Sequence, residues 1–181
     1  MPTIEVPVSR VTLSDLQEVK RFLGARGIGC DHWHTPIPLA PEATEAEILA
    51  AYADWLGPLM SEGGYAKADV LRVTPRLENI DGVRHKFLRE HTHAEDEVRF
   101  FVEGKGLFWF NPTGDGSDVF VVHCGAGDIV SVPAGMRHWF DMGASPRYTA
   151  IRVFTSPAGW TPVYTDSGLE AHFNRPYHQV L

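Results

Sequence analysis

Residues 87–110 read FLREHTHAEDEVRFFVEGKGLFWF, and this stretch predicts both the fold and the site. It contains His91, His93 and Glu97 within seven residues. In an extended strand, residues at odd-numbered positions point to the same face. One strand and its turn can therefore present two imidazoles and one carboxylate to a single cavity, which is the ligand set of a 2-His-1-carboxylate metal site.

Residues 127–138, GDIVSVPAGMRH, supply a candidate for a fourth ligand. The pattern is typical of strand, turn and strand, with Pro133 and Gly135 in the turn. We expect this hairpin to point His138 into the same barrel as the first three side chains. Three imidazoles and a carboxylate, without a thiolate, favour Fe(II), Ni(II), Co(II) or Mn(II) over structural zinc and suit an octahedral ion with open positions.

Short β-rich runs, separated by Gly, Pro, Asp and Asn, follow one another from residue 65 onward. They predict strands near 68–74, 84–89, 97–103, 106–110, 118–123, 128–132, 136–140 and 147–155. Such a series favours a closed or double-sheet β architecture. The run Gly104-Lys105-Gly106 predicts a tight hairpin between two of these strands.

The first third of the chain has helical rather than β patterning. A capping box that begins at Ser14 predicts a helix over about 14–24, and another that begins at Thr44 predicts a second helix. Because proline lacks the backbone donor of a helix interior, Pro58 is expected to end or kink the second helix near Leu56.

The length of 181 residues favours a single domain. We divide it into an N-terminal segment with two helices at 1–64, a β-barrel core at 65–155 and a C-terminal segment at 156–181 that wraps the barrel. The formal net charge of −7, with no block of Lys and Arg, argues against nucleic acid or a membrane as partner. Two distant cysteines and the lack of a signal-peptide pattern indicate a cytoplasmic protein, which we expect to be a monomer.

The two ligand-bearing stretches resemble the paired motifs of the cupin superfamily, which are double-stranded jelly-roll barrels around one metal ion. A narrower resemblance is carried by EGGY at 62–65, KFLREHTHAEDEVRFFVEGKGLFWF at 86–110, GDIVSVPAGMRHWF at 127–140 and RVFTSPAGW at 152–160. Together with the helical preface, these motifs are similar to the acireductone dioxygenase family of methionine salvage, over about residues 13–165. The resemblance implies a mostly β cupin barrel with an N-terminal helical segment.

Carried over by position, the resemblance implies a complete set of site residues. The metal ligands would be His91, His93, Glu97 and His138; the basic residues facing the substrate would be Arg99 and Arg152; the aromatic wall would be Phe87, Phe140 and Trp160. Strand parity agrees independently, because Arg99 shares a face with Glu97 and Phe140 shares a face with His138. Taken without the resemblance, Arg99 could be a surface ion-pair partner of Glu95 or Asp96, Arg152 a structural salt bridge, and the aromatic residues ordinary core.

The implied reaction is cleavage of acireductone, 1,2-dihydroxy-5-methylthiopent-1-en-3-one, by O2. In this family Fe(II) gives 4-methylthio-2-oxobutanoate and formate, whereas Ni(II) gives 3-methylthiopropanoate, formate and carbon monoxide. The ligands are the same in both cases, so the sequence does not choose between the products. Two alternatives stay open: another cupin dioxygenase acting on a different enediol or thiol, and a non-catalytic metal-binding cupin.

Overall fold

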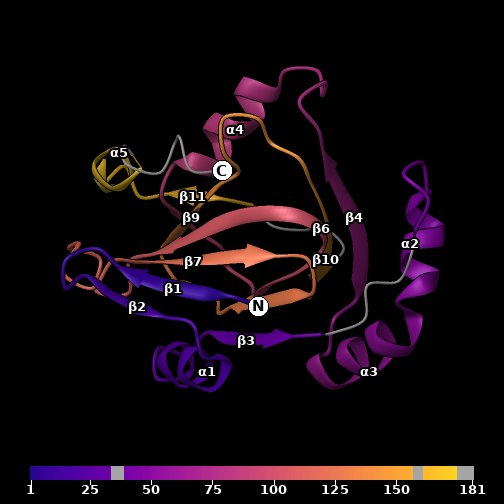
Figure 1. Ribbon diagram of the computed structural model, residues 1–181, viewed down its shortest axis with the longest axis horizontal. Coiled ribbons are helices and arrows are strands. Elements are labelled where there is room, and N and C mark those ends of the chain that lie inside the picture. Colours follow the sequence, from indigo (N-terminus) through magenta and orange to yellow (C-terminus); the bar gives the residue numbers. More distant parts are fainter. Residues whose placement is uncertain (34–38, 157–160, 175–181) are drawn as a thin grey trace.

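The computed structural model describes residues 1–33, 39–156 and 161–174 (Figure 1). The strands are β1 (Thr3–Val6), β2 (Val11–Leu13), β3 (Gly29–His32), β4 (Lys67–Val73), β5 (His91–Thr92), β6 (Glu97–Phe110), β7 (Phe120–Gly125), β8 (Asp128–Val132), β9 (His138–Asp141), β10 (Tyr148–Phe154) and β11 (Val163–Tyr164). The helices are α1 (Leu16–Gly24), α2 (Glu45–Ala51), α3 (Ala53–Gly63), α4 (Ile80–Leu88) and α5 (Leu169–Phe173).

Two antiparallel sheets form the barrel, and the long strand β6 belongs to both. One sheet has the order β11-β5-β9-β6-β7-β1-β2, and the other has the order β4-β10-β6-β8-β3. The N-terminal half of β6 pairs with β8 and β10, while its C-terminal half pairs with β7 and β9. The double-sheet β architecture expected from the sequence is therefore confirmed.

The predicted hairpin at 104–106 is wrong, because β6 runs without a turn from Glu97 to Phe110. The local irregularity is a β-bulge instead. Thr149 on β10 lies opposite Glu103 and Ala150 lies opposite Phe101, which leaves Val102 as an extra residue. Gly104 follows with a φ of 78°, which a residue with a Cβ rarely adopts, so the glycine serves a bend within one strand.

The predicted strand at 84–89 is also wrong, since these residues lie in or directly after helix α4. Ile80, Val83 and Phe87 recur at helical spacing, and all three pack against the barrel core. The hydrophobic pattern of a short amphipathic helix was thus mistaken for that of a strand. Figure 1 shows α4 beside β9, at one end of the barrel.

The N-terminal helices begin and break at positions that differ in part from those expected. Helix α1 is capped by Asp15 rather than Ser14, since the Asp15 carboxylate accepts from the backbone N–H of the second and third helical residues at 3.0 Å. The capping box at Thr44 is confirmed. The break comes at Tyr52, whose ring packs 5.1 Å from that of Phe100, and α3 then continues through Pro58. The interruption thus lies at a residue that packs against the barrel and not at the proline.

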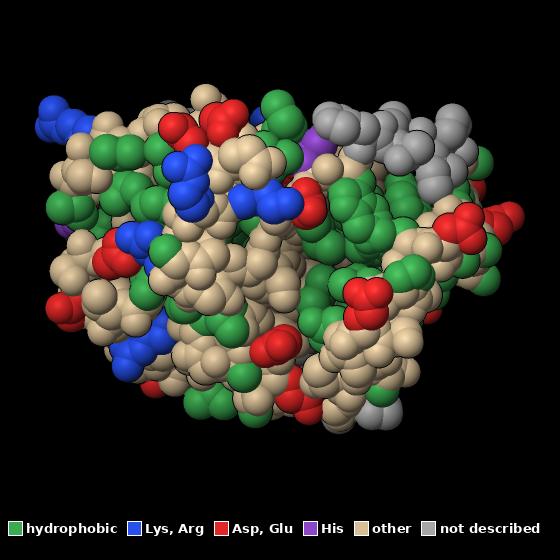
Figure 2. All heavy atoms as spheres, turned by 90° about the horizontal axis from the view of Figure 1, so that it is seen from below, with side chains coloured by type: hydrophobic (Ala, Val, Ile, Leu, Met, Phe, Trp, Pro, Cys, Tyr) green, Lys and Arg blue, Asp and Glu red, His purple; other side chains and the backbone are tan. Residues whose placement is uncertain are grey.

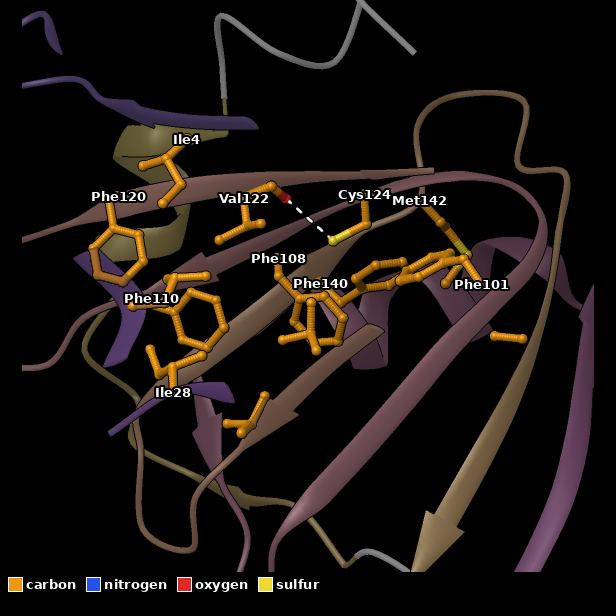
Figure 3. Packing of buried hydrophobic residues seen from close by; sticks show 14 of the residues in the cluster. Ile4, Ile28, Phe101, Phe108, Phe110, Phe120, Val122, Cys124, Phe140 and Met142 are labelled. Atoms are coloured by element: carbon orange, nitrogen blue, oxygen red, sulfur yellow. Dashed lines mark hydrogen bonds between the residues drawn. The ribbon is translucent and has the colours of Figure 1, made fainter. Parts of the chain in front are cut away.

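Aromatic side chains fill the interior of the barrel (Figure 3). Phe101, Phe108 and Phe140 lie together there, with ring centroids 4.9–6.4 Å apart. A second cluster joins Val98 and Phe100, on the outer face of β6, to helices α2 and α3. In the part of the chain that the structure describes, no helix is long and apolar enough to cross a membrane. Among the described residues on the face in Figure 2, Lys and Arg side chains lie beside acidic and hydrophobic ones.

Candidate metal centre

Three imidazoles meet at one end of the barrel. His91 lies on β5, His93 follows that strand, and His138 begins β9 directly opposite His91. One ring nitrogen from each of the three lies within 4.8 Å of the other two, and all three side chains are buried. The structure therefore brings together three of the four predicted ligands in an arrangement that could hold a metal ion.

The turn before His138 differs from the predicted hairpin, although it delivers the side chain as expected. Strand β8 pairs with β3 and β6, whereas β9 pairs with β5 and β6, so residues 133–137 connect the two sheets instead of joining neighbouring strands. The physical reason is the length of β6, which offers separate pairing sites to β8 and β9.

Backbone carbonyls orient all three imidazoles in the same way. Because a carbonyl can only accept, each Nδ1 must carry the proton and donate it, which leaves the Nε2 lone pair available as a ligand. The bonds run from His91 to Arg89 at 2.6 Å, from His138 to Met136 at 2.9 Å and from His93 to Thr161 at 3.2 Å. Burial and then the neighbouring His138 lower the pKa of His91 to about 3, so its imidazole is neutral.

Glu97 completes the predicted set from the start of β6. Its Oε2 lies 3.2 Å from Nε2 of His93 and 3.2 Å from Nε2 of His138. Burial alone would raise the pKa of Glu97, but the Arg99 guanidinium beside it holds this pKa well below its ordinary value. The carboxylate is therefore ionised inside the barrel.

The chemistry of these four side chains fits a divalent metal ion. With both Nδ1 protons directed at carbonyls, the Nε2 atoms of His93 and His138 and the Glu97 oxygen are three acceptors that face one another, and a cation between them would satisfy all three. Neighbouring ligands of an octahedral ion with bonds of about 2.1 Å are about 3.0 Å apart. The observed spacing of 3.2 Å is close to that value.

A cavity of about 180 Å³ opens onto the four side chains. Its wall contains every described residue that the sequence predicted for the site, together with four that it did not: Lys86, Phe108, Pro162 and Tyr164. The remaining predicted residue, Trp160, lies outside the described residues.

Arg99 is buried in the cavity wall, with only 1% of its surface exposed. It donates to Oε1 of Glu97 at 2.7 Å, so it fixes the carboxylate whose other oxygen faces the histidines. Its guanidinium carbon lies 4.6 Å from the ring centroid of Phe140 and 5.0 Å from that of Phe108. The interpretation of Arg99 as a surface residue is therefore wrong.

Arg152 combines the two interpretations that the sequence left open. On β10 it lies between Arg99 of β6 and Asp69 of β4. It forms a bidentate pair with Asp69, with both nitrogen–oxygen distances at 2.8 Å, and its side chain also lines the cavity. A structural salt bridge thus holds a guanidinium at the cavity wall.

Sequence reasoning missed Phe108 and Lys86 for identifiable reasons. Counting parity from Glu97 places the even-numbered Phe108 on the outer face, but the bulge at Val102 reverses the faces of the later part of β6. Lys86 was hidden by the strand assignment of what is helix α4. The signal that could have found Lys86 is the helical spacing of Ile80, Val83 and Phe87.

A double-sheet β-barrel that carries three inward-facing histidines and a glutamate near one end defines a cupin. The chain matches the ARD/ARD' family over residues 13–162, and it belongs to this family.

Similar proteins are known by sequence and by structure. Acireductone dioxygenase from Picosynechococcus sp. is 52% identical over 173 residues, which cover 96% of this chain and 97% of the relative. Acireductone dioxygenase from Granulibacter bethesdensis is 42% identical over 171 residues, covering 94% and 93%. Among solved structures, acireductone dioxygenase from Bacillus anthracis with a cadmium ion in its active centre superposes with a TM-score of 0.82 at 30% identity, covering 91% of this chain and 98% of that one.

Proposed function

We propose that this chain is a metal-dependent dioxygenase that cleaves acireductone with O2 in methionine salvage. The observation that carries the proposal is the meeting of three carbonyl-oriented imidazoles, two of which lie 3.2 Å from the Glu97 carboxylate. The relatives named acireductone dioxygenase support it, because the similarity extends over almost the whole of both chains.

The proposed ligands are His91, His93, Glu97 and His138, and the proposed ion is Fe(II) or Ni(II), with Co(II) or Mn(II) as substitutes. The cadmium ion of the similar Bacillus anthracis structure supports a divalent ion at this position. When bound, such an ion would supply Lewis acidity that stabilises the negative charge on the oxygens of an enediolate.

The side chains of the cavity would bind and orient the substrate. Arg99 is held by Glu97 and by aromatic rings, so it presents a fixed positive charge to the enediolate without having to reorganise. Arg152 is fixed in a similar way by Asp69. Phe87 and Phe140, whose centroids are 6.3 Å apart, would exclude water and contact the methylthio tail, and Trp160 would extend this wall.

The reaction would form 4-methylthio-2-oxobutanoate and formate with Fe(II), or 3-methylthiopropanoate, formate and carbon monoxide with Ni(II). The test is to load the purified protein anaerobically with each metal, to add acireductone and O2, and to identify the products, including carbon monoxide, alongside elemental analysis. Failure of both forms to consume acireductone would refute the proposal. Preference for an enediol or thiol without the methylthio tail would favour a different cupin dioxygenase.

Metal binding can be tested separately from turnover. We expect His91→Ala and Glu97→Ala to lose the bound ion while keeping the β-rich circular dichroism spectrum. Retention of the ion by both folded variants would contradict the proposed ligand set.

We also propose that residues 1–181 act as one domain, as a monomer and in the cytoplasm. The pairing of β1 with β7 and of β3 with β8 supports a single unit, because strands from the N-terminal segment extend both sheets of the barrel. Light scattering coupled to size exclusion tests the monomer, and a mass twice that of the chain would contradict it.

A further inference from the structure

The charges around the metal cavity are not all compensated in the same way. Its wall contains three cationic side chains, Lys86, Arg99 and Arg152, and one carboxylate, Glu97. Arg99 forms its ion pair with Glu97 at 2.7 Å, and Arg152 forms a bidentate pair with Asp69. Each arginine therefore has a carboxylate close by that offsets its charge.

Lys86 differs from the two arginines in burial and in partners. It is exposed, and within the described ranges no carboxylate lies within ion-pair distance of its ammonium group. Its helix α4 is held against the barrel by Ile80, Val83 and Phe87, and Phe87 also lines the cavity. The backbone of Lys86 is thus fixed beside the cavity, while its flexible four-carbon stem leaves the ammonium group free to move.

We propose that Lys86 is a specificity-determining residue that draws anionic enediols, as enediolates, into this cavity. This inference rests on the proposed function and names the charge state of the substrate that the same site selects. An uncompensated cation at the entrance of a low-dielectric cavity raises the local concentration of anions. Arg99 and Arg152 then act at short range on a substrate that has already entered, because the Glu97 and Asp69 carboxylates largely offset their charges at longer distances.

The proposed role of Lys86 predicts how the dissociation constant for acireductone should differ among four proteins: wild type, Lys86→Met, Lys86→Arg and Lys105→Met. Methionine keeps an unbranched stem but removes the charge, and arginine restores the charge. Lys105 is an exposed residue of β6 outside the cavity wall, so Lys105→Met is a matched control with the same change in net charge.

The assay is titration of the nickel-loaded proteins with acireductone under argon, where binding occurs without turnover. At low salt we expect Lys86→Met to raise the dissociation constant about tenfold, which equals about 1.4 kcal/mol. Lys86→Arg should stay within about threefold of wild type. The difference should shrink at high salt, because screening weakens exposed charges first. In steady-state assays with O2, Lys86→Met should raise KM and leave kcat unchanged.

Equal dissociation constants for Lys86→Met and Lys105→Met at low salt would overturn the role of Lys86. If Lys86→Met fails to fold, Lys86→Gln makes the same test. If wild type turns over acireductone normally and both methionine variants bind it equally, the role of Lys86 is rejected and the proposed function stands. If wild type neither binds nor consumes acireductone, the proposed function is rejected as well.

Discussion

Gly106 on β6 is the position where a single methyl group should most directly disturb the cavity wall. A Cβ atom placed there would lie 2.2 Å from Cζ and 2.6 Å from Cε2 of the Phe140 ring. Ordinary contacts of this kind begin at 3.4 Å, so the Gly106→Ala variant requires the ring to move by about 1.2 Å.

The ring of Phe140 has little room for such a movement. Only 1% of the residue is exposed, and its ring packs 4.9 Å from Phe108 and 5.5 Å from Tyr148. Overpacking of this kind costs about 1–3 kcal/mol of unfolding free energy. For a domain of this size, a cost of about 2 kcal/mol lowers Tm by about 4–8 °C. Because Phe140 also contacts Arg99, KM for acireductone should rise.

The measurement is thermal unfolding followed by circular dichroism, with Gly57→Ala as the matched control. Gly57 lies within α3, and a Cβ atom at this position would have no neighbouring atom within 4 Å. Alanine there should therefore stabilise the protein by roughly 0.5–1 kcal/mol. The two substitutions are chemically identical and should shift Tm in opposite directions. A Tm for Gly106→Ala at or above that of wild type would refute the packing argument.

Three further predictions concern the charged groups and the metal. Arg99→Met should lower the unfolding free energy by about 3–5 kcal/mol, because it leaves the buried Glu97 carboxylate without its counter-charge. Urea unfolding measures this loss, and a loss below about 1 kcal/mol would contradict the prediction. The pKa of His91 falls from an ordinary 6.5 to about 3 on folding, so between these values the unfolded chain binds the extra proton. The metal-free protein should therefore lose stability as pH falls through this window, by at most about 1.4 kcal/mol per pH unit from this group, and His91→Gln should reduce the slope measured by urea unfolding. Nickel at one hundred times its dissociation constant should add about 2.7 kcal/mol of stability in calorimetry, an effect that EDTA reverses; a similar gain in His138→Ala would place the ion elsewhere.

The β architecture and most of the candidate site could be predicted from the sequence, because the patterns that indicate them are local. The two-residue period of a strand is local, so the shared face of Glu97 and Arg99 follows directly from their spacing. His138 was predicted because its turn residues mark the start of a new strand, even though the connection crosses between sheets. Trp160 stays a prediction.

The remaining features depend on contacts distant in sequence. The bulge at Val102 arises from the pairing of β6 with β10, and no local pattern around Gly104 distinguishes it from a hairpin. Tyr52 interrupts the helices where its ring meets Phe100, about fifty residues further along the chain. Helix α4 was missed because its short apolar pattern fits a strand almost equally well.

The bulged strand also determines how this protein can tolerate changes in length. Glu97 and Arg99 line the cavity from odd-numbered positions, whereas Phe108 lines it from an even-numbered one, and Val102 between them makes both possible. Deleting that one residue would restore a regular alternation and keep Phe108 inward. Deleting one residue between Gly104 and Phe108 instead, with the bulge kept, would direct Leu107 inward in its place. Gaps between Gly104 and Phe108 should therefore be rare among functional descendants of this chain, whereas substitutions that keep the number of residues there remain open to selection.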